Sequence, residues 1–200
     1  MARYMRFVAP FLGIGSDERR RLLRRAWSEL PAPTSSELGT ACLALMKQPQ
    51  REFHYSVADL ITRFIDATDE YFLDEYVTTL LTTKSWWDTV DGIGTAAVSP
   101  LCWRYDASRI ILEWSASDNI WLIRAAIQHQ RGWKRDTDVA FVLDICRAHV
   151  DSAEFFIAKA IGWALRDIAR FDPTAVRRFL EQNAGLSPVA VREANRTLTG

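Results

Sequence analysis

Three charged side chains recur at nearly the same place in a repeated stretch of sequence. Asp91 lies 6 residues after the expected helix start at Ser85, and Arg124 lies 6 residues after the one at Asp118. Lys159 lies 7 residues after the expected start at Ser152. Equivalent positions of stacked repeats form a column. We therefore predict that Asp91, Arg124 and Lys159 share one surface. A carboxylate held on such a surface can stabilise a developing positive charge and orient a water molecule.

Indole rings lie close to all three of these positions. The chain has 8 tryptophans in 200 residues, and the three near the charged column are Trp87, Trp121 and Trp163. Indoles beside charges indicate a surface that stacks or packs against a ligand. Alternatively, the rings fill gaps between helices while Asp91 and Arg124 form a salt bridge between repeats. A carboxylate beside a tryptophan pair is costly to bury for structure alone, which favours a functional role for Trp87 and Asp91.

The elements that position these residues are expected to be helices. Apolar residues recur at helical spacing almost throughout, and no segment keeps a period of two. The first expected helix runs from Ser16 to the residue before Pro31, one further helix begins at Ser85, and two more begin at Pro173 and Pro188. The other expected helices cover Ser36–Lys47, Arg51–Ala67, Glu70–Thr82, Asp106–Ala116, Asn119–Gln130, Asp138–Ala148 and Ala153–Arg170. Ser16 is predicted to cap the first helix, Ser85 to form a capping box with Asp88, and Asp172 and Ser187 to cap helices that begin with proline.

The expected helix starts have a regular period. Arg51, Ser85, Asp118, Ser152 and Ser187 are separated by 34, 33, 34 and 35 residues, and each interval holds two helices and two short turns. This length is typical of helical solenoids such as HEAT or tetratricopeptide arrays. A four-helix bundle also pairs its helices but gives no reason for a constant period. We predict an all-α fold, a curved solenoid of antiparallel helix pairs (HEAT-like repeats), as a single domain over residues 1–200.

Charge is segregated along the chain although the formal net charge is zero. Seven bases against two acids give residues 1–25 a balance of +5, and three bases against nine acids give residues 51–91 a balance of −6. Zero net charge at first argues against a nucleic-acid partner. Segregation still allows one surface to be basic and another acidic, although the basic run from Arg19 to Arg25 is equally explained as a solvated helix face.

Several functional classes are excluded or disfavoured. No apolar run is long enough for a membrane span, and the N-terminus lacks the pattern of a signal peptide, so we expect a cytoplasmic protein with no membrane partner. The three scattered cysteines are predicted to be reduced packing residues, and no metal site is expected. Gly92–Ala97 matches a dinucleotide fingerprint, but no strand precedes it. Three further tryptophans, Trp103, Trp114 and Trp133, are predicted to serve packing.

Motifs spread over nearly the whole chain resemble one family. The stretches are Met1-Ala2-Arg3-Tyr4-Met5, Phe11-Leu12-Gly13-Ile14, Thr83-Lys84-Ser85-Trp86-Trp87-Asp88-Thr89-Val90-Asp91, Ser117-Asp118-Asn119-Ile120-Trp121-Leu122, Arg124-Ala125-Ala126, and Phe155-Phe156-Ile157 through Lys159-Ala160-Ile161-Gly162-Trp163. In these residues the chain closely resembles the AlkD-type family of bacterial DNA alkylation-repair glycosylases, which are built from HEAT-like repeats. The run from Thr83 to Asp91 is long and unusual in composition, so chance agreement is improbable.

The resemblance implies excision of cationic N3- and N7-alkylated purines, such as 3-methyladenine and 7-methylguanine, by hydrolysis of the N-glycosidic bond. It implies a catalytic carboxylate at Asp91 and aromatic groups against the lesion at Trp87 and Trp163. The residues expected to contact DNA are Arg124, Tyr4, Lys159, Trp121, Lys84 and Ser85. The expected partner is double-stranded DNA with alkylated bases, bound by a monomer without a cofactor. Family members usually carry a further helical segment before the first motif, and we expect that segment to be missing here.

Two other functions remain open. A non-catalytic HEAT-like module would bind DNA structures or a protein partner without releasing a base. A purely protein-binding solenoid would use its concave surface for a peptide. The presence together of Trp87, Asp91, Arg124 and Trp163 weighs against the last, because a peptide groove needs no such set.

Overall fold

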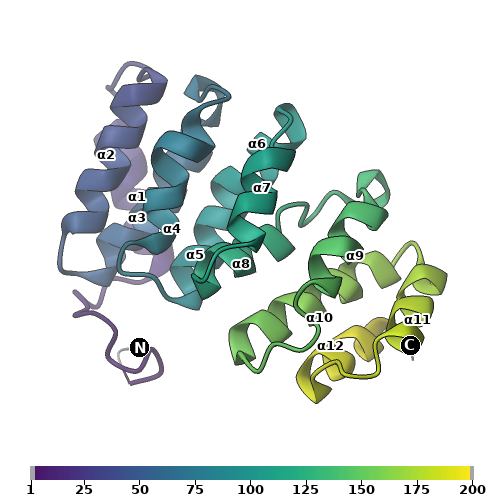
Figure 1. Ribbon diagram of the computed structural model, residues 1–200. Coiled ribbons are helices and arrows are strands. Elements are labelled where there is room, and N and C mark those ends of the chain that lie inside the picture. The colour runs from purple at the N-terminus through teal and green to yellow at the C-terminus, as the bar shows by residue number, and fades with distance from the viewer. Residues whose placement is uncertain (1–2, 199–200) are drawn as a thin grey trace. The chain divides into compact units, whose positions relative to one another are not determined.

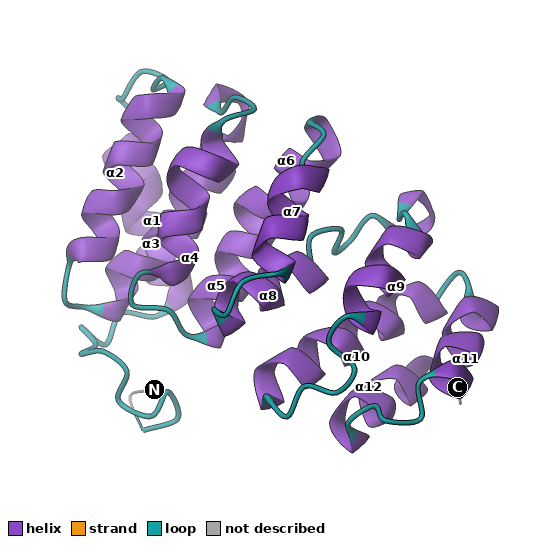
Figure 2. Cartoon of the chain, in the orientation of Figure 1, coloured by secondary structure: helices purple, strands orange, loops and turns teal. Residues whose placement is uncertain are grey.

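Helices are the only regular elements in residues 3–198, the part of the chain that the computed structural model describes (Figure 2). The predicted all-α class is therefore confirmed. The chain forms two compact units, the first ending at Leu101 and the second beginning at Cys102. The curved solenoid and the single domain over residues 1–200 concern both units together and stay predictions. No helix in the described range is long and apolar enough to cross a membrane.

The first unit is built around helix α3 (Figure 1). Its elements are α1 (Ser16–Trp27), α2 (Ser35–Lys47), α3 (Arg51–Arg63), the 3-10 turn η1 (Ile65–Ala67), the π segment η2 (Leu73–Val77) leading into α4 (Thr78–Thr82), and α5 (Trp87–Ile93), which continues through the π segment η3 (Gly94–Val98). The boundary between the units falls within the next helix, α6 (Ser99–Arg104). Helix α3 packs against α2, α5 and η3. Val57 and Ile61 on α3 and Ile93 on α5 are buried in this core.

The second unit is built around the long helix α10 (Figure 1). Its elements are α7 (Ser108–Ser115), α8 (Ile120–Ile127), the 3-10 turn η4 (Lys134–Asp136), α9 (Val139–Arg147), α10 (Phe155–Ala169), α11 (Pro173–Gln182) and α12 (Pro188–Leu198). Helix α10 packs against α8, α9, α11 and α12. Gly162 permits the close approach of α12, because a Cβ atom there would lie 2.6 Å from the Cβ of Glu193 and 3.0 Å from the backbone oxygen of Ala190.

The predicted period is preserved, although helix ends differ by a few residues. The first helices of the repeats begin at Arg51, Trp87, Ile120, Phe155 and Pro188, 33 to 36 residues apart. In the first unit α3 packs on α5, and in the second unit α10 packs on both α8 and α12. The expected helix from Glu70 begins only at Leu73, and the one from Arg51 ends at Arg63 before a 3-10 turn.

Some expected caps form and others do not. Asp138 and Asp172 accept hydrogen bonds from the amides of Phe141 and Ala175, as expected of N-caps. Ser16 is instead the first helical residue, after Gly15. The prediction of a capping box between Ser85 and Asp88 is wrong. The helix starts after Trp86, whose amide is 3.3 Å from the Thr89 hydroxyl, and the Asp88 carboxylate binds other partners.

The packing role predicted for three tryptophans holds for one and fails for another. Trp114 is buried. Trp103 is 58% exposed, and its ring lies edge-on to Trp133 with the centroids 5.0 Å apart. Trp103 lies in the last turn of α6 and keeps more than half of its surface exposed.

Candidate functional site

Trp87 and Asp91 lie on one face of α5, because residues four apart share a helix face. Both side chains are partly exposed. The Tyr4 ring stands edge-on to the Trp87 indole, with the centroids 6.3 Å apart and the planes at 89°. Tyr4 is itself 72% exposed. The first unit thus brings together three residues that the sequence assigned to the site, two aromatic rings and a carboxylate at a surface.

The segment that carries Tyr4 is tied to the start of α3. The Glu52 carboxylate accepts hydrogen bonds from the amides of Leu12, Gly13 and Ile14, at 3.0, 2.9 and 3.3 Å. Burial alone would raise the pKa of Glu52, but hydrogen bonds from backbone amides outweigh it and the pKa is lowered. Met5 is buried and anchors the segment next to Tyr4. The motif Phe11–Ile14 therefore positions Tyr4 through Glu52.

A buried ion pair fixes the start of α5. Arg51 is fully buried, and its guanidinium binds both carboxylate oxygens of Asp88, at 2.5 and 3.3 Å. The Tyr55 hydroxyl donates to the same carboxylate at 2.5 Å, and burial together with this carboxylate raises the pKa of Tyr55. Arg51 also donates to the Thr89 hydroxyl and the Lys84 carbonyl. Asp88 thus joins α5 to α3 and holds Trp87 and Asp91 in place.

Lys84 and Ser85, both expected to contact DNA, bond to helix ends in this structure. The Lys84 ammonium donates to the carbonyls of Lys47 and Gln48, at 2.8 and 2.6 Å, and so caps the C-terminus of α2. The Ser85 hydroxyl donates to the Leu81 carbonyl at 2.5 Å. Lys84 has a left-handed backbone, with φ of 46°. These bonds give both residues a structural role, and their contact with DNA stays a prediction.

In the second unit, cations surround the indole of Trp163. Within 6.0 Å of the ring centroid lie the charged groups of Arg124 at 5.1 Å, Arg131 at 5.2 Å, Lys159 at 5.6 Å and Arg166 at 6.0 Å. Cations at these distances are attracted by the ring quadrupole. The second unit therefore brings Arg124, Lys159 and Trp163 together, as the sequence predicted for these three. The wider column, with Asp91, spans both units and stays a prediction.

Arg124 differs from an exposed phosphate ligand. Its side chain is only 1% exposed, and its guanidinium donates to the Phe156 carbonyl at 2.6 Å. The Phe156 ring in turn contacts Trp121, with the centroids 5.1 Å apart. Arg124 and Trp121 on α8 thus meet the first turn of α10. Arg124 joins these two helices in this structure, and its contact with DNA stays a prediction.

Glu193 on α12 organises the cations near Trp163. This buried carboxylate accepts from Lys159 at 2.7 Å, Arg166 at 3.1 Å and Arg196 at 3.0 Å. Burial would raise the pKa of Glu193, but the hydrogen bond and charge of Lys159 and the charges of both arginines lower it. One acid holds three cations, so this cluster keeps a surplus of positive charge. Such a surface favours an anionic ligand.

Several residues that support the site were not predicted, among them Arg51, Glu52, Arg166 and Glu193. One signal was available, because Lys159, Trp163 and Arg166 are spaced i, i+4 and i+7 and must share a helix face. No local pattern marks Glu52 or Glu193, whose partners are distant in sequence. The basic run of α1 is also partly neutralised, since Arg19 and Arg20 both pair with Asp59.

Metal and thiol chemistry find little support in the described residues. Among residues 3–198, no three His, Cys, Asp or Glu side chains gather closely enough to hold a metal ion. Cys42 and Cys146 are fully buried, as predicted for packing residues, and burial raises the pKa of each thiol to about 12. A thiol with so high a pKa is a poor nucleophile at neutral pH.

These features define an all-α protein with an acid and aromatic rings on one unit and a cation-ringed indole on the other. The family model described as DNA alkylation repair enzyme matches residues 1–198. The chain therefore belongs to the DNA alkylation repair enzyme family. Among solved structures it is similar to a chain titled "Predicted DNA alkylation repair enzyme from Enterococcus faecalis", with 25% identity and a TM-score of 0.84 over 98% of this chain and 92% of that one. Comparison with curated proteins gives no match.

Proposed function

We propose that this protein is a DNA glycosylase that excises cationic N3- and N7-alkylated purines by hydrolysing the N-glycosidic bond. The observation that carries the proposal is the exposed face of α5, where the Asp91 carboxylate lies four residues from Trp87 and Tyr4 stands against that indole. The chain's membership in a DNA alkylation repair family supports the proposal that a repair reaction takes place at this face. The proposed substrate is double-stranded DNA that contains 3-methyladenine or 7-methylguanine.

The chemistry suits a lone carboxylate. An alkylated purine already carries positive charge, so it leaves with the electron pair of the C1′–N bond and needs no strong general acid. Positive charge then develops on the deoxyribose, where the Asp91 carboxylate stabilises it and orients the water that adds to C1′. The face of the Trp87 indole adds attraction for the cationic sugar. The water passes one proton to the Asp91 carboxylate, which releases it to solvent, and the products are the free purine and an abasic site.

The second unit has the charge required to hold the DNA backbone. Lys159 and Arg166 flank Trp163, and their shared acid Glu193 leaves positive charge in excess. A surplus of cations binds phosphates and makes the affinity fall as salt rises. In this proposal the first unit supplies the catalytic carboxylate and the second supplies much of the affinity.

Release of the free base tests the proposal directly. The protein is incubated with methylated duplex DNA, and 3-methyladenine and 7-methylguanine are quantified by mass spectrometry against the same DNA without protein. We expect release well above spontaneous loss. Release equal to spontaneous loss would reject the glycosylase.

A second candidate is a DNA-binding module without catalysis. The cation cluster around Trp163 favours it, because cations there would attract phosphates whether or not a base is removed. It predicts salt-dependent binding of DNA with no base released. The same methylated DNA, used in a binding assay and in the release assay, distinguishes the two candidates.

A further inference from the structure

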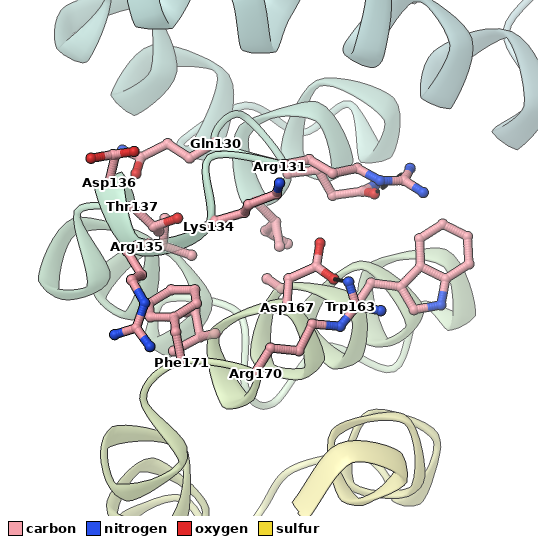
Figure 3. Close-up of a pocket in the computed structure, with 16 residues that line it drawn as sticks. Gln130, Arg131, Lys134, Arg135, Asp136, Thr137, Trp163, Asp167, Arg170 and Phe171 are labelled. Atoms are coloured by element: carbon pink, nitrogen blue, oxygen red, sulfur yellow. Dashed lines mark hydrogen bonds and ion pairs between the residues drawn. The ribbon is translucent and has the colours of Figure 1, made fainter.

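A pocket of about 540 Å³ lies in the second unit, between the loop that follows α8 and the C-terminal half of α10 (Figure 3). Arg131, Lys134, Arg135 and Asp136 come from the loop, Asp167 comes from α10, and Arg170 directly follows α10. Ile127, Val142, Ala164 and Ile168 give it an apolar wall. Trp163 lines its edge, so the pocket adjoins the cation cluster described above. Its volume lies in the range of small-ligand sites.

The basic loop has a strained backbone. Gly132 and Lys134 both have left-handed backbones, with φ of 90° and 58°. Glycine adopts this conformation without cost, whereas a lysine there is disfavoured by the clash of its Cβ atom. Such strain persists only where the surroundings fix it, and it is concentrated at functional sites.

Two buried side chains fix the loop. The His129 Nδ1–H donates to the Ala126 carbonyl at 2.7 Å, so its Nε2 is left to accept from the Gln130 amide nitrogen at 3.0 Å. The Gln130 carbonyl oxygen then accepts from the amide of Asp138 at 2.7 Å, on the far side of the loop. Burial lowers the pKa of His129 to about 4, so the ring stays neutral near pH 7 and the chain of bonds is kept.

The charges at the pocket are unevenly matched. Arg170 pairs with Asp167 at 3.4 Å. Lys134 and Arg135 are exposed, and within residues 3–198 no carboxylate forms an ion pair with either. Figure 3 shows Lys134 extending toward Arg131 and Arg135 extending toward Phe171, on different sides of the pocket. The lining has more cations than carboxylates even with Asp136 and Asp167 counted, and this surplus beside an apolar wall suits an anion attached to a less polar group. A phosphate ester of a nucleoside has this chemistry.

We propose that this pocket binds a phosphodiester group of the DNA strand, with Lys134 on the phosphate and the apolar wall against the adjoining sugar. The inference rests on the proposed function, which supplies DNA as the ligand. It adds a second phosphate site beside the cluster at Trp163. His129 and Gln130 are positioning residues in this arrangement, because they act through the shape of the loop.

The substitution Lys134→Gly tests the site, because its two effects have opposite signs. It removes the ammonium, so we expect an about tenfold loss of affinity and a salt slope smaller by about one. Glycine also relieves the left-handed strain, so the melting temperature stays the same or rises. Affinity is measured by fluorescence anisotropy at several salt concentrations, with a duplex that contains an uncleavable abasic analogue.

Arg178→Ala is the matched control, since Arg178 is exposed on α11 and does not line the pocket. We expect unchanged affinity and salt slope for it. Equal affinity and slope for the wild type and Lys134→Gly would overturn the site, as would equal losses in both variants. A falling melting temperature with Lys134→Gly would overturn the role of strain in presenting Lys134.

Two further measurements show whether the bound phosphate belongs to DNA or to a free nucleotide, and whether the protein is a glycosylase. Calorimetry with a deoxynucleoside monophosphate and with inorganic phosphate should give binding much weaker than that of the duplex. Tight mononucleotide binding that Lys134→Gly abolishes, with duplex affinity unchanged, would overturn the DNA site in favour of a free nucleotide. Base release by the wild type is measured on the same preparation. Its absence would reject the glycosylase, while the Lys134→Gly result alone decides the pocket.

Discussion

The two units each present a partly exposed indole, but opposite charges surround the two rings. Trp87 has the Tyr4 ring beside it and the Asp91 carboxylate on its own helix face, whereas Trp163 has four cations within 6.0 Å of its centroid. Repeats of one architecture thus differ in electrostatic environment. A carboxylate suits the stabilisation of a cation, and a ring of cations suits a phosphate backbone.

The supports beneath the two indoles differ in the same way. In the first unit a buried arginine meets a single carboxylate, so Arg51 and Asp88 neutralise each other. In the second unit the buried Glu193 meets three cations. The first arrangement fixes a helix without adding net charge, and the second fixes a helix while leaving net positive charge at the surface. Each of the following changes acts on one unit and tests this difference.

Arg51→Ala is expected to have the largest effect, and the effect should fall on the first unit. Removing one partner leaves Asp88 uncompensated and costs about 3–5 kcal/mol of unfolding free energy. Chemical denaturation measures the loss, and hydrogen exchange read by mass spectrometry locates it. Arg21→Ala is the matched control, because its pair with Glu18 is exposed at 72% and 58% and is worth at most about 1 kcal/mol. Equal losses in the two variants would contradict the role of the buried pair.

Gly162→Ala should cause the next largest loss of stability, and the loss should fall on the second unit. The added Cβ would meet Glu193 and the backbone of α12, and we expect a loss of about 2–3 kcal/mol from overpacking. Gly94→Ala is the control within a helical segment, since nothing lies within 4 Å of its added Cβ. That variant should gain about 0.5–1 kcal/mol. Thermal melts decide, and a shift of the same sign in both variants would refute the close approach of α10 and α12.

Acid should destabilise the second unit through His129. Burial lowers the pKa of His129 from 6.5 to about 4, so between these values the unfolded chain binds a proton that the folded chain does not. Stability is therefore full above about pH 6.5 and falls as the pH drops toward 4, by about 2 kcal/mol between pH 7 and pH 5. Melting curves across this range should be less pH-dependent for His129→Asn. A wild-type slope retained in that variant would assign the acid sensitivity to another group.

Much of the fold could be predicted from the sequence, because helices leave local signals. The apolar period gave the all-α class, and the spacing of helix starts gave the repeat. Asp172 was recognisable as a cap because a cap acts within three residues. Trp87 and Asp91 could be assigned to one face because they are four residues apart on one helix.

The remaining features depend on partners far apart in the sequence. Asp88 was expected to complete a capping box with Ser85, but its carboxylate binds Arg51, 37 residues away, together with the amide of Thr89. Lys84 stands in a conspicuous motif, yet its ammonium caps the end of α2. Glu193 and Glu52 gave no signal, because each gathers groups from segments that only tertiary packing brings together.

The most direct test of the central claim compares base release and DNA affinity in Asp91→Asn. Single-turnover release from methylated duplex should fall by roughly 10²- to 10³-fold, because the charge that stabilises the transition state is lost. The dissociation constant for the same duplex should stay nearly unchanged, and Asp118→Asn, at an exposed carboxylate, should leave both quantities unchanged. Retained release by Asp91→Asn, or a loss of release fully explained by weaker binding, would contradict the assignment of catalysis to Asp91.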